Sequence, residues 1–404
     1  KSRCRAMSVM EIPAVYNETL EKCLSCGKCM GRCESLQRAG MSLLEIANGM
    51  RNALVRSSDE TELAMSIMAT PGLVQAVRGC FFCENCIVKC EADIKVSELV
   101  YESRKVFQND GLIERSAWTS VQVDQEWDIF TAYRAIYGIG YSDLTRHVSS
   151  EGHEPETDCQ VAFFPGCSLA AYGPELCREV FGTIEELGGK TTMIDECCGS
   201  PLKSAGFLDR AAALEQRIVD EIVTSGAAEV VCACPGCRNM VEGAMAKRGL
   251  DVRAVTVSRF LREHGFAPRH VDGKVRFFKS CQDRDASYLD DTMALVDGQT
   301  FQGVICNSCC GAGGAVSASF PEQQQAKVRS ILAQCEPGDT VVTMCPTCTY
   351  TQVFQMINDG RSDLSCKNYL ELLFNADFDW NTTFAQLGGM WSGEYGAWLS
   401  QTFA

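Results

Sequence analysis

Long apolar runs are absent from this sequence of 404 residues. A membrane-spanning helix needs roughly 18 or more consecutive apolar residues, and the chain has no such window. No signal peptide is visible either, and the chain begins at Lys1 rather than Met. We therefore expect no membrane span.

Positive charge is also scarce. The chain has 37 lysine and arginine residues against 52 aspartate and glutamate residues, a net charge of -15 at pH 7. Nucleic-acid phosphates and anionic membrane surfaces both attract basic patches. The charge balance therefore argues against nucleic acid as a partner and against anchoring on an anionic membrane.

Histidine and nucleotide-binding motifs are scarce as well. The four histidines lie in a linker or outside any motif, and we predict surface roles for them. The stretch 311–314, Gly-Ala-Gly-Gly, lacks the G-x-G-x-x-G spacing, and we interpret it as a turn that follows a cysteine pair. No Walker motif, flavin fingerprint or serine triad is evident. A nucleotide or flavin would have to come from another subunit.

Cysteine, by contrast, is abundant. The chain has 25 cysteines, and most lie in clusters with metal-ligand spacing rather than in a disulfide framework. Disulfides are disfavoured in a reducing compartment, so we expect a cytoplasmic protein from an oxygen-poor cell. Seven cysteines fall outside the clusters, and we predict each to be a small buried hydrophobic residue. They are Cys4, Cys159, Cys177, Cys232, Cys306, Cys335 and Cys366.

Ten of the cysteines form one pattern of five that occurs twice. In each copy, a cysteine after an apolar run is followed by an adjacent Cys-Cys-Gly and then by Cys-Pro-x-Cys. Equivalent cysteines in the two copies are 111 to 114 residues apart, which indicates a duplicated domain. The first set is Cys167, Cys197, Cys198, Cys234 and Cys237, and the second is Cys281, Cys309, Cys310, Cys345 and Cys348.

Adjacent cysteines can reach one centre only from a bent turn, which the following glycine permits. A single zinc ion takes four ligands, commonly as two C-x2-C pairs, whereas five thiols with an adjacent pair suit a larger polynuclear centre. We therefore favour an iron-sulfur cluster in each copy. Zinc, structural buried thiols and disulfides are the alternatives.

A second cysteine motif occurs twice near the N-terminus. Its spacing, C-x2-C-x2-C-x3-C, is typical of bacterial two-cluster ferredoxins, in which the fourth cysteine ligates the other cluster. Glu34 and Glu91 replace the usual proline after the motif. We predict two cubane 4Fe-4S clusters, with zinc as the alternative. One cluster would use Cys23, Cys26, Cys29 and Cys90, and the other would use Cys80, Cys83, Cys86 and Cys33.

The N-terminal third is helical in pattern. Apolar residues recur at three- and four-residue steps over 41–54. Thr70 and Pro71 suggest an N-cap and a first-turn proline. We expect residues 1–22 to form an irregular arm. The aromatic stretch within 95–145 is expected to pack in the core or against another protein of a complex, and 146–158 to be a linker.

From residue 159 the chain alternates between short apolar strands and helices, which implies parallel sheets with helices on their faces. The cysteines would then lie in loops at the carboxyl ends of strands. We also expect a closing helix in each copy, at 258–263 and 367–372. Strands are predicted at 161–164, 191–194, 229–231, 275–278, 301–305 and 340–344, and helices at 174–187, 211–223 and 324–333.

The duplicated pattern resembles the CCG domain found in the B-type subunits of heterodisulfide reductase, over residues 158 to about 375. Helices between the N-terminal motifs resemble the alpha-helical ferredoxin of the C-type subunits. The resemblance implies an α+β multidomain protein, with a ferredoxin domain at 1–108, a helical connector at 109–157, and two pseudo-twofold related α/β CCG domains at 158–272 and 273–404. It also implies a non-cubane 4Fe-4S cluster on each set of five cysteines, the two clusters facing each other.

By that resemblance the chain is a fusion of C-type and B-type parts that reduces a disulfide with electrons from two cubane clusters. The implied partners are a flavoprotein of the heterodisulfide reductase A type or other redox proteins of the complex, and a small disulfide or sulfur-carrier substrate. The main alternative is an electron-transfer subunit, like that of anaerobic glycerol-3-phosphate dehydrogenase or glycolate oxidase, which passes electrons from a flavin enzyme toward quinone. A reductase of protein-bound persulfide or trisulfide is a third possibility.

Overall fold

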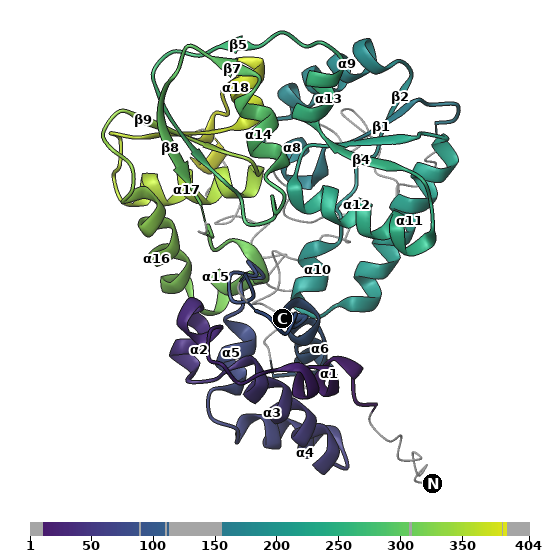
Figure 1. Cartoon of the computed structure of the whole chain (residues 1–404), viewed down its shortest axis with the longest axis vertical. Coiled ribbons are helices and arrows are strands. Elements are labelled where there is room, and N and C mark those ends of the chain that lie inside the picture. Colours follow the sequence, from purple (N-terminus) through teal and green to yellow (C-terminus); the bar gives the residue numbers. More distant parts are fainter. Residues whose placement is uncertain are drawn as a thin grey trace.

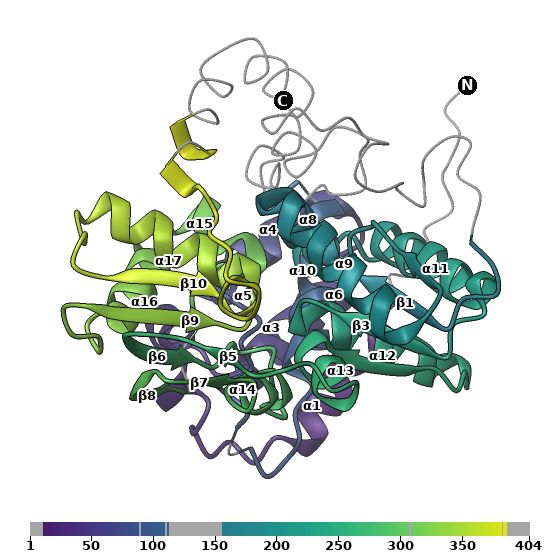
Figure 2. The same cartoon turned by 90° about the horizontal axis from the view of Figure 1, so that it is seen from above.

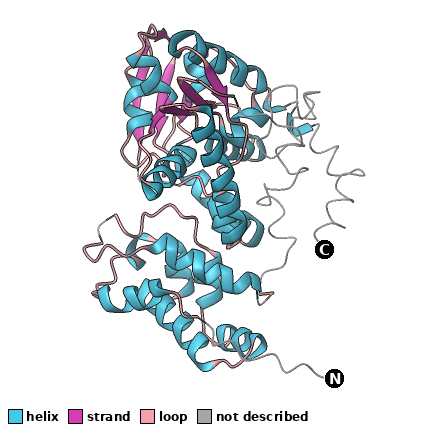
Figure 3. Cartoon of the chain, turned by 90° about the vertical axis from the view of Figure 1, so that its right-hand side faces the viewer, coloured by secondary structure: helices cyan, strands magenta, loops and turns pink. Residues whose placement is uncertain are grey.

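The computed structural model describes residues 11–88, 90–109, 111–112, 156–306, 309–381 and 383–385. A helical region formed by residues 11–112 lies below two α/β halves that stand side by side (Figures 1 and 2). Figure 3 shows that all the strands drawn belong to the α/β part. The predicted aromatic stretch from 113 onward, most of the linker, Cys4, His147 and His153 lie outside the described residues.

The N-terminal helical region packs around one apolar cluster. Ser42 caps the long helix α3 in a capping box with Glu45, and Ile46 and Met50 bury its inner face. Two local expectations were wrong. Residues 14–22 form a helix that starts directly after Pro13, and the N-cap of α5 is Gly72 rather than Thr70. The elements are α1 (Ala14–Lys22), η1 (Met30–Arg32), α2 (Glu34–Ala39), α3 (Leu43–Arg56), α4 (Glu60–Met68), α5 (Leu73–Arg78) and α6 (Val96–Asn109).

Each α/β half is built on a parallel sheet of four strands. The strand orders, β2-β1-β3-β4 and β10-β9-β6-β8, are the same topology traced in opposite directions, with β1 equivalent to β6. The duplicated sequence pattern therefore corresponds to a duplicated fold. The strands are β1 (Val161–Phe164), β2 (Thr191–Met193), β3 (Glu229–Cys232), β4 (Arg253–Thr256), β6 (Lys274–Phe278), β8 (Thr300–Ile305), β9 (Asp339–Thr343) and β10 (Ser365–Asn368). A separate pair consists of β5 (Arg269–His270) and β7 (Val296–Asp297).

The six predicted strands are confirmed, and the edge strands β4 and β10 were missed. β10 takes up the first two residues of the closing helix expected at 367–372, so that α18 begins at Tyr369. The first half has the helices α8 (Gly166–Tyr172), α9 (Pro174–Gly188), α10 (Ser200–Ala205), α11 (Leu208–Ser225), α12 (Pro235–Arg248) and α13 (Val257–Glu263). The second has α14 (Ser287–Met293), η3 (Gly313–Ala315), α15 (Val316–Ser319), α16 (Pro321–Leu332), α17 (Pro346–Asn358) and α18 (Tyr369–Phe374).

The two α/β halves share a core. One apolar cluster contains residues from β1 and β3 of the first half and from β6 and β9 of the second. Two buried tyrosines of the second half reach into the first: Tyr288 donates to the carbonyl of Cys232 at 2.9 Å, and Tyr369 to that of Ala233 at 3.0 Å. Because these bonds fix the end of β3, they hold the loop that carries Cys234 against the second half.

A buried carboxyl group lies on α18, the helix whose apolar residues pack into this core. Glu371 completes a capping box on α18 and accepts hydrogen bonds from the backbone N–H groups of Asn368 and Phe378. Burial raises the pKa of Glu371 to about 7. The folded protein therefore holds this proton more tightly than the unfolded chain does.

The raised pKa predicts a pH dependence of stability. The contribution of Glu371 is fully present below its unfolded pKa and is lost as pH rises through about 7. A shift of this size is worth about 3 kcal/mol. Relative to Glu371→Gln, the wild-type protein should lose unfolding free energy between pH 5 and pH 8, as measured by anaerobic urea unfolding of both proteins. Parallel pH profiles of the two proteins would contradict the prediction.

No helix within the described ranges has both the length and the apolar character needed to cross a bilayer.

Candidate functional site

The first five-cysteine set lies at the carboxyl ends of three neighbouring strands. Cys167 is in the first turn of α8 after β1, and Cys197 and Cys198 follow β2. Cys234 is the N-cap of α12 after β3, and Cys237 is in the first turn of that helix. Gly199 takes a positive φ of 73° directly after the adjacent pair. This is the bent turn that two adjacent ligands require.

The second set repeats this placement. Cys281 follows β6, and Cys309 and Cys310 follow β8. Cys345 is the N-cap of α17 after β9, with Cys348 in the first turn of the helix. The N-terminal end of a helix favours negative charge, so both C-P-x-C segments are placed where thiolates are stabilised.

The thiols within each set are in contact. Their side chains form a continuous series of hydrogen bonds, and in the second set the Sγ atoms of Cys348 and Cys310 are 3.3 Å apart. Through such contacts the first series runs Cys167, Cys197, Cys198, Cys237 and Cys234. The second series runs Cys281, Cys309, Cys310, Cys348 and Cys345.

The two sets also meet each other. The Sγ atoms of Cys234 and Cys345, equivalent residues in the two halves, are 3.9 Å apart. Beside them, the hydroxyl groups of Ser168 and Thr347 are 3.0 Å apart. The ten thiols therefore form one continuous group that spans the two halves.

These thiols have strongly displaced pKa values. Hydrogen bonds from Cys197 and Cys237 hold the pKa of Cys198 well below its usual range. Hydrogen bonds to Cys198 and Cys234, together with burial, raise the pKa of Cys237 well above it. Neighbouring buried thiols cannot all ionise without a cation among them, and a bound metal deprotonates the thiols that coordinate it.

The donor set fits iron-sulfur clusters. Soft thiolates are the ligands of such clusters, and the backbone leaves room for the sulfur atoms. A Cβ on Gly166, which has a φ of 69°, would lie 2.9 Å from the Sγ of Cys237. Within the described ranges, no three histidine, cysteine or carboxylate side chains are arranged to hold a single metal ion. The thiols instead form contiguous groups of five.

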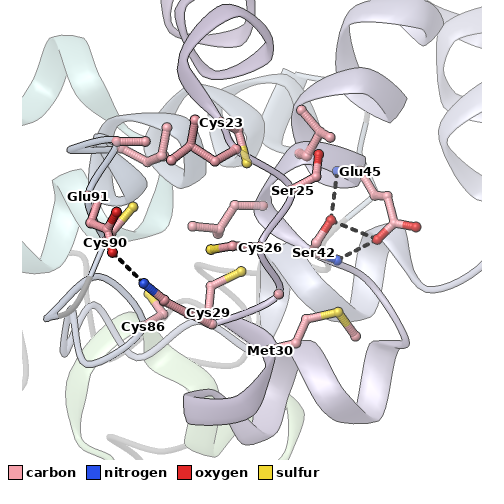
Figure 4. A pocket seen from close by; sticks show the side chains of 17 residues that line it. Cys23, Ser25, Cys26, Cys29, Met30, Ser42, Glu45, Cys86, Cys90 and Glu91 are labelled. Carbon is pink, nitrogen blue, oxygen red and sulfur yellow. Dashed lines mark hydrogen bonds and ion pairs between the residues drawn. The ribbon is translucent and has the colours of Figure 1, made fainter.

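The N-terminal cysteines form two groups. Cys23, Cys26, Cys29 and Cys90, the first ligand set expected, line one pocket of about 340 Å³ together with Cys86 (Figure 4). Lys28 donates to Glu91 at 2.5 Å and so joins the two motifs beside this pocket. Hydrogen bonding to Glu91 raises the pKa of Lys28.

The second N-terminal group lies deeper. Cys33, Cys80, Cys83 and Cys86 interact electrostatically with one another. Burial raises the pKa of Cys80 to about 12. Cys83 is hydrogen-bonded to Cys309 of the second α/β half, which raises the pKa of Cys83. This contact connects the deeper N-terminal group to the ten thiols.

The cysteines outside the motifs largely behave as expected. Cys159, Cys177, Cys232 and Cys366 are buried and Cys335 is half-buried. Cys306, however, is exposed, so its predicted burial was wrong. It follows β8, a strand at the edge of the second sheet.

Basic side chains near the site are engaged with protein groups. Lys203 lies over the ring of Tyr101 at 5.1 Å, and Arg284 forms an ion pair with Glu84 at 2.8 Å. Lys279 donates to the backbone carbonyl of Arg284 at 3.3 Å. No pattern in the sequence indicates these contacts.

Comparisons with known proteins agree with this site. The model of the cysteine-rich CCG domain matches residues 161–242 and 275–351. The B subunit of fumarate reductase (CoM/CoB) from Methanothermobacter marburgensis is 23% identical over 379 residues, covering 89% of this chain and 73% of that protein. The D subunit of dihydromethanophenazine:CoB--CoM heterodisulfide reductase from Methanosarcina acetivorans is 22% identical over 400 residues, covering 89% of this chain and 93% of that protein.

An uncharacterized iron-sulfur protein of Methanococcus maripaludis is 22% identical over 288 residues, or 68% of this chain and 56% of that protein. No solved structure matches the chain significantly. The paired CCG domains and the relatives that match along most of the chain indicate iron-sulfur clusters and a role in electron transfer. The chain carries a pair of CCG domains and is similar along most of its length to the D subunit of heterodisulfide reductase and to the B subunit of fumarate reductase (CoM/CoB).

Proposed function

We propose that this chain is an oxidoreductase subunit that carries electrons through two cubane 4Fe-4S clusters to a pair of non-cubane clusters, where a disulfide is reduced. The cubane clusters would be held by the two N-terminal cysteine groups and the non-cubane clusters by the two sets of five thiols. The bound clusters would supply one-electron transfer.

The thiol contacts support an order of transfer. The pocket group, Cys23, Cys26, Cys29 and Cys90, is adjacent to the deeper group through Cys86. The deeper group touches the second five-thiol set through Cys83 and Cys309. That set touches the first through Cys345 and Cys234. We infer that electrons follow these contacts from the N-terminal region to the paired CCG sites.

The pocket group is the site where we expect electrons to enter the chain. Cys26 is exposed, and the neighbouring Leu24 is 64% exposed. An apolar side chain beside an accessible thiol suits contact with a second redox protein. We propose that a flavoprotein binds here and supplies the electrons. The chain would then need no flavin site of its own.

The contact between Cys234 and Cys345, at 3.9 Å, is the observation that carries the proposal. Reduction of a disulfide consumes two electrons and two protons, breaks one sulfur–sulfur bond and gives two thiols. Two adjacent one-electron sites can supply one electron to each sulfur. A protein that only relays single electrons would not need two equivalent sites in contact.

Iron and sulfide analysis combined with turnover tests this function. Protein purified without oxygen should contain about sixteen irons for four 4Fe-4S clusters, and it should oxidise reduced viologen when a small disulfide is added. Full iron content with electron transfer to a quinone, but not to disulfides, would instead favour the relay between a flavin dehydrogenase and quinone. A content of about eight irons would contradict the assignment of clusters to the CCG sites.

A further inference from the structure

Arg104 is the largest side chain in the described part of the protein that is completely buried, with an exposed fraction of 0%. It lies on α6 of the N-terminal region, at the boundary with both α/β halves. Its guanidinium donates to the backbone carbonyls of Val77, Arg78 and Cys80 in its own region. It also donates to the carbonyls of Ser204 in the first half, at 2.6 Å, and Gly314 in the second, at 2.7 Å.

These contacts use every donor of the side chain. A guanidinium has five N–H groups, and Nε, Nη1 and Nη2 of Arg104 together make six contacts with backbone oxygens. The side chain is therefore fixed in place and has no donor left for a substrate. Its remaining chemical property is a permanent positive charge in the protein interior.

That charge lies next to the deeper N-terminal cysteine group. Arg104 binds the carbonyl of Cys80 at 3.0 Å, and its guanidinium lies 4.9 Å from the ring centre of Phe82, between Cys80 and Cys83 in the sequence. A buried charge is poorly screened, so it acts strongly on a neighbouring redox centre.

We propose that Arg104 sets the reduction potential of the cluster on Cys33, Cys80, Cys83 and Cys86. A cation near a cluster stabilises its reduced form, which carries one more negative charge. Arg104 makes this inner cluster a better electron acceptor than the outer cluster in the exposed pocket, and so draws electrons toward the CCG domains. It is a positioning residue rather than a ligand, and the inference rests on the function proposed above.

Redox titration of the fully loaded protein, followed by electron paramagnetic resonance, tests this role. Cys26→Ser assigns the signal of the outer cluster. Arg104→Gln should lower the midpoint potential of the inner cluster by a tenfold or larger shift in its redox equilibrium, which is about 59 mV for one electron. The outer cluster should keep its potential and serves as the internal reference.

Two further variants separate charge from packing. Arg104→Lys keeps the charge but has only three donors, so its inner cluster should stay within a tenfold shift of wild type although the protein is less stable. Lys105→Gln removes a positive charge from the next residue on α6, which lines an open cleft between the N-terminal region and the α/β halves. Because water screens an exposed charge, this variant should change neither potential. If Arg104→Gln does not retain iron, Arg104→Met is used in its place, and a tenfold or larger shift of the inner potential in Arg104→Lys then contradicts the proposal.

The proposal is overturned if Arg104→Gln loads its clusters and keeps the wild-type inner potential. It is also overturned if Arg104→Lys and Arg104→Gln shift that potential equally, because loosened packing would then be the cause. Absence of both cubane signals from the wild-type protein would instead contradict the proposed function.

Discussion

Replacing Cys309 with serine is expected to empty the second CCG site and abolish disulfide reduction. Cys309 is 5% exposed and is hydrogen-bonded to Cys281 and Cys310 of its own set. It is also the residue that contacts Cys83 of the N-terminal region. The substitution therefore removes both an expected ligand and the contact through which we infer that electrons arrive.

The expected effects are large because a serine hydroxyl is a poor ligand for iron. Iron content should fall by about four atoms, one cluster, and turnover with a small disulfide by about 100-fold or more. The N-terminal signals should persist, since none of their expected ligands is changed. Iron analysis, paramagnetic resonance and a viologen-linked assay measure the three quantities.

Cys335→Ser is the matched control for this experiment. Cys335 lies in the same α/β half, is half-buried and belongs to none of the cysteine motifs. Its replacement should leave iron content and turnover close to wild type. If Cys309→Ser behaved like this control, the Cys309 thiol would be structural, and the assignment of the second CCG site would have to be abandoned.

The sequence predicted the parts of the fold that local chemistry determines. The central strands β1, β3, β6 and β9 each contain at least two adjacent, buried apolar residues, as expected of parallel strands covered on both faces. The edge strands β4 and β10 were missed because their sequences, Arg-Ala-Val-Thr and Ser-Cys-Lys-Asn, are partly polar and only half covered. Periodicity alone does not distinguish such edges from loops.

The candidate ligands stay a prediction from the spacing of the cysteines, which limits which thiols can share a centre. The contacts between domains could not be predicted, because they join residues far apart in sequence. Arg104 looks like an ordinary helical surface residue until α10 and η3 pack over it. Similarly, the sequence predicts only that Gly313 and Gly314 belong to the turn after the cysteine pair. In the structure, they pack against the backbone of Phe81 and Cys80.

Replacing Gly314 with alanine is expected to separate the N-terminal region from the second CCG half. A Cβ at Gly314 would lie 2.2 Å from the carbonyl oxygen of Cys80 and 3.3 Å from Nη1 of Arg104. Its φ of 71° is also unfavourable for alanine. Since the nearest atom belongs to the backbone, the clash cannot be relieved by rotating a side chain, and the two regions must move apart.

Displacement there would weaken the hydrogen bond from Arg104 to the carbonyl of Gly314 and the contact between Cys83 and Cys309. We expect a loss of about 3 kcal/mol of unfolding free energy. Disulfide turnover should fall by about 10-fold or more, because the inferred electron path is lengthened at one step. Iron content should be unchanged, since Gly314 is no ligand, and this separates the variant from Cys309→Ser.

Gly226→Ala supplies the matched control, because Gly226 ends α11 with a φ of 76° and has no atom within 4 Å of an added Cβ. This variant has the same backbone strain, about 1 to 2 kcal/mol, without the collision. The difference between the two variants in unfolding free energy and turnover therefore measures the domain contact itself. Equal effects in both would mean that the close approach at Gly314 does not hold the regions together, and that electrons need not pass from Cys83 to Cys309.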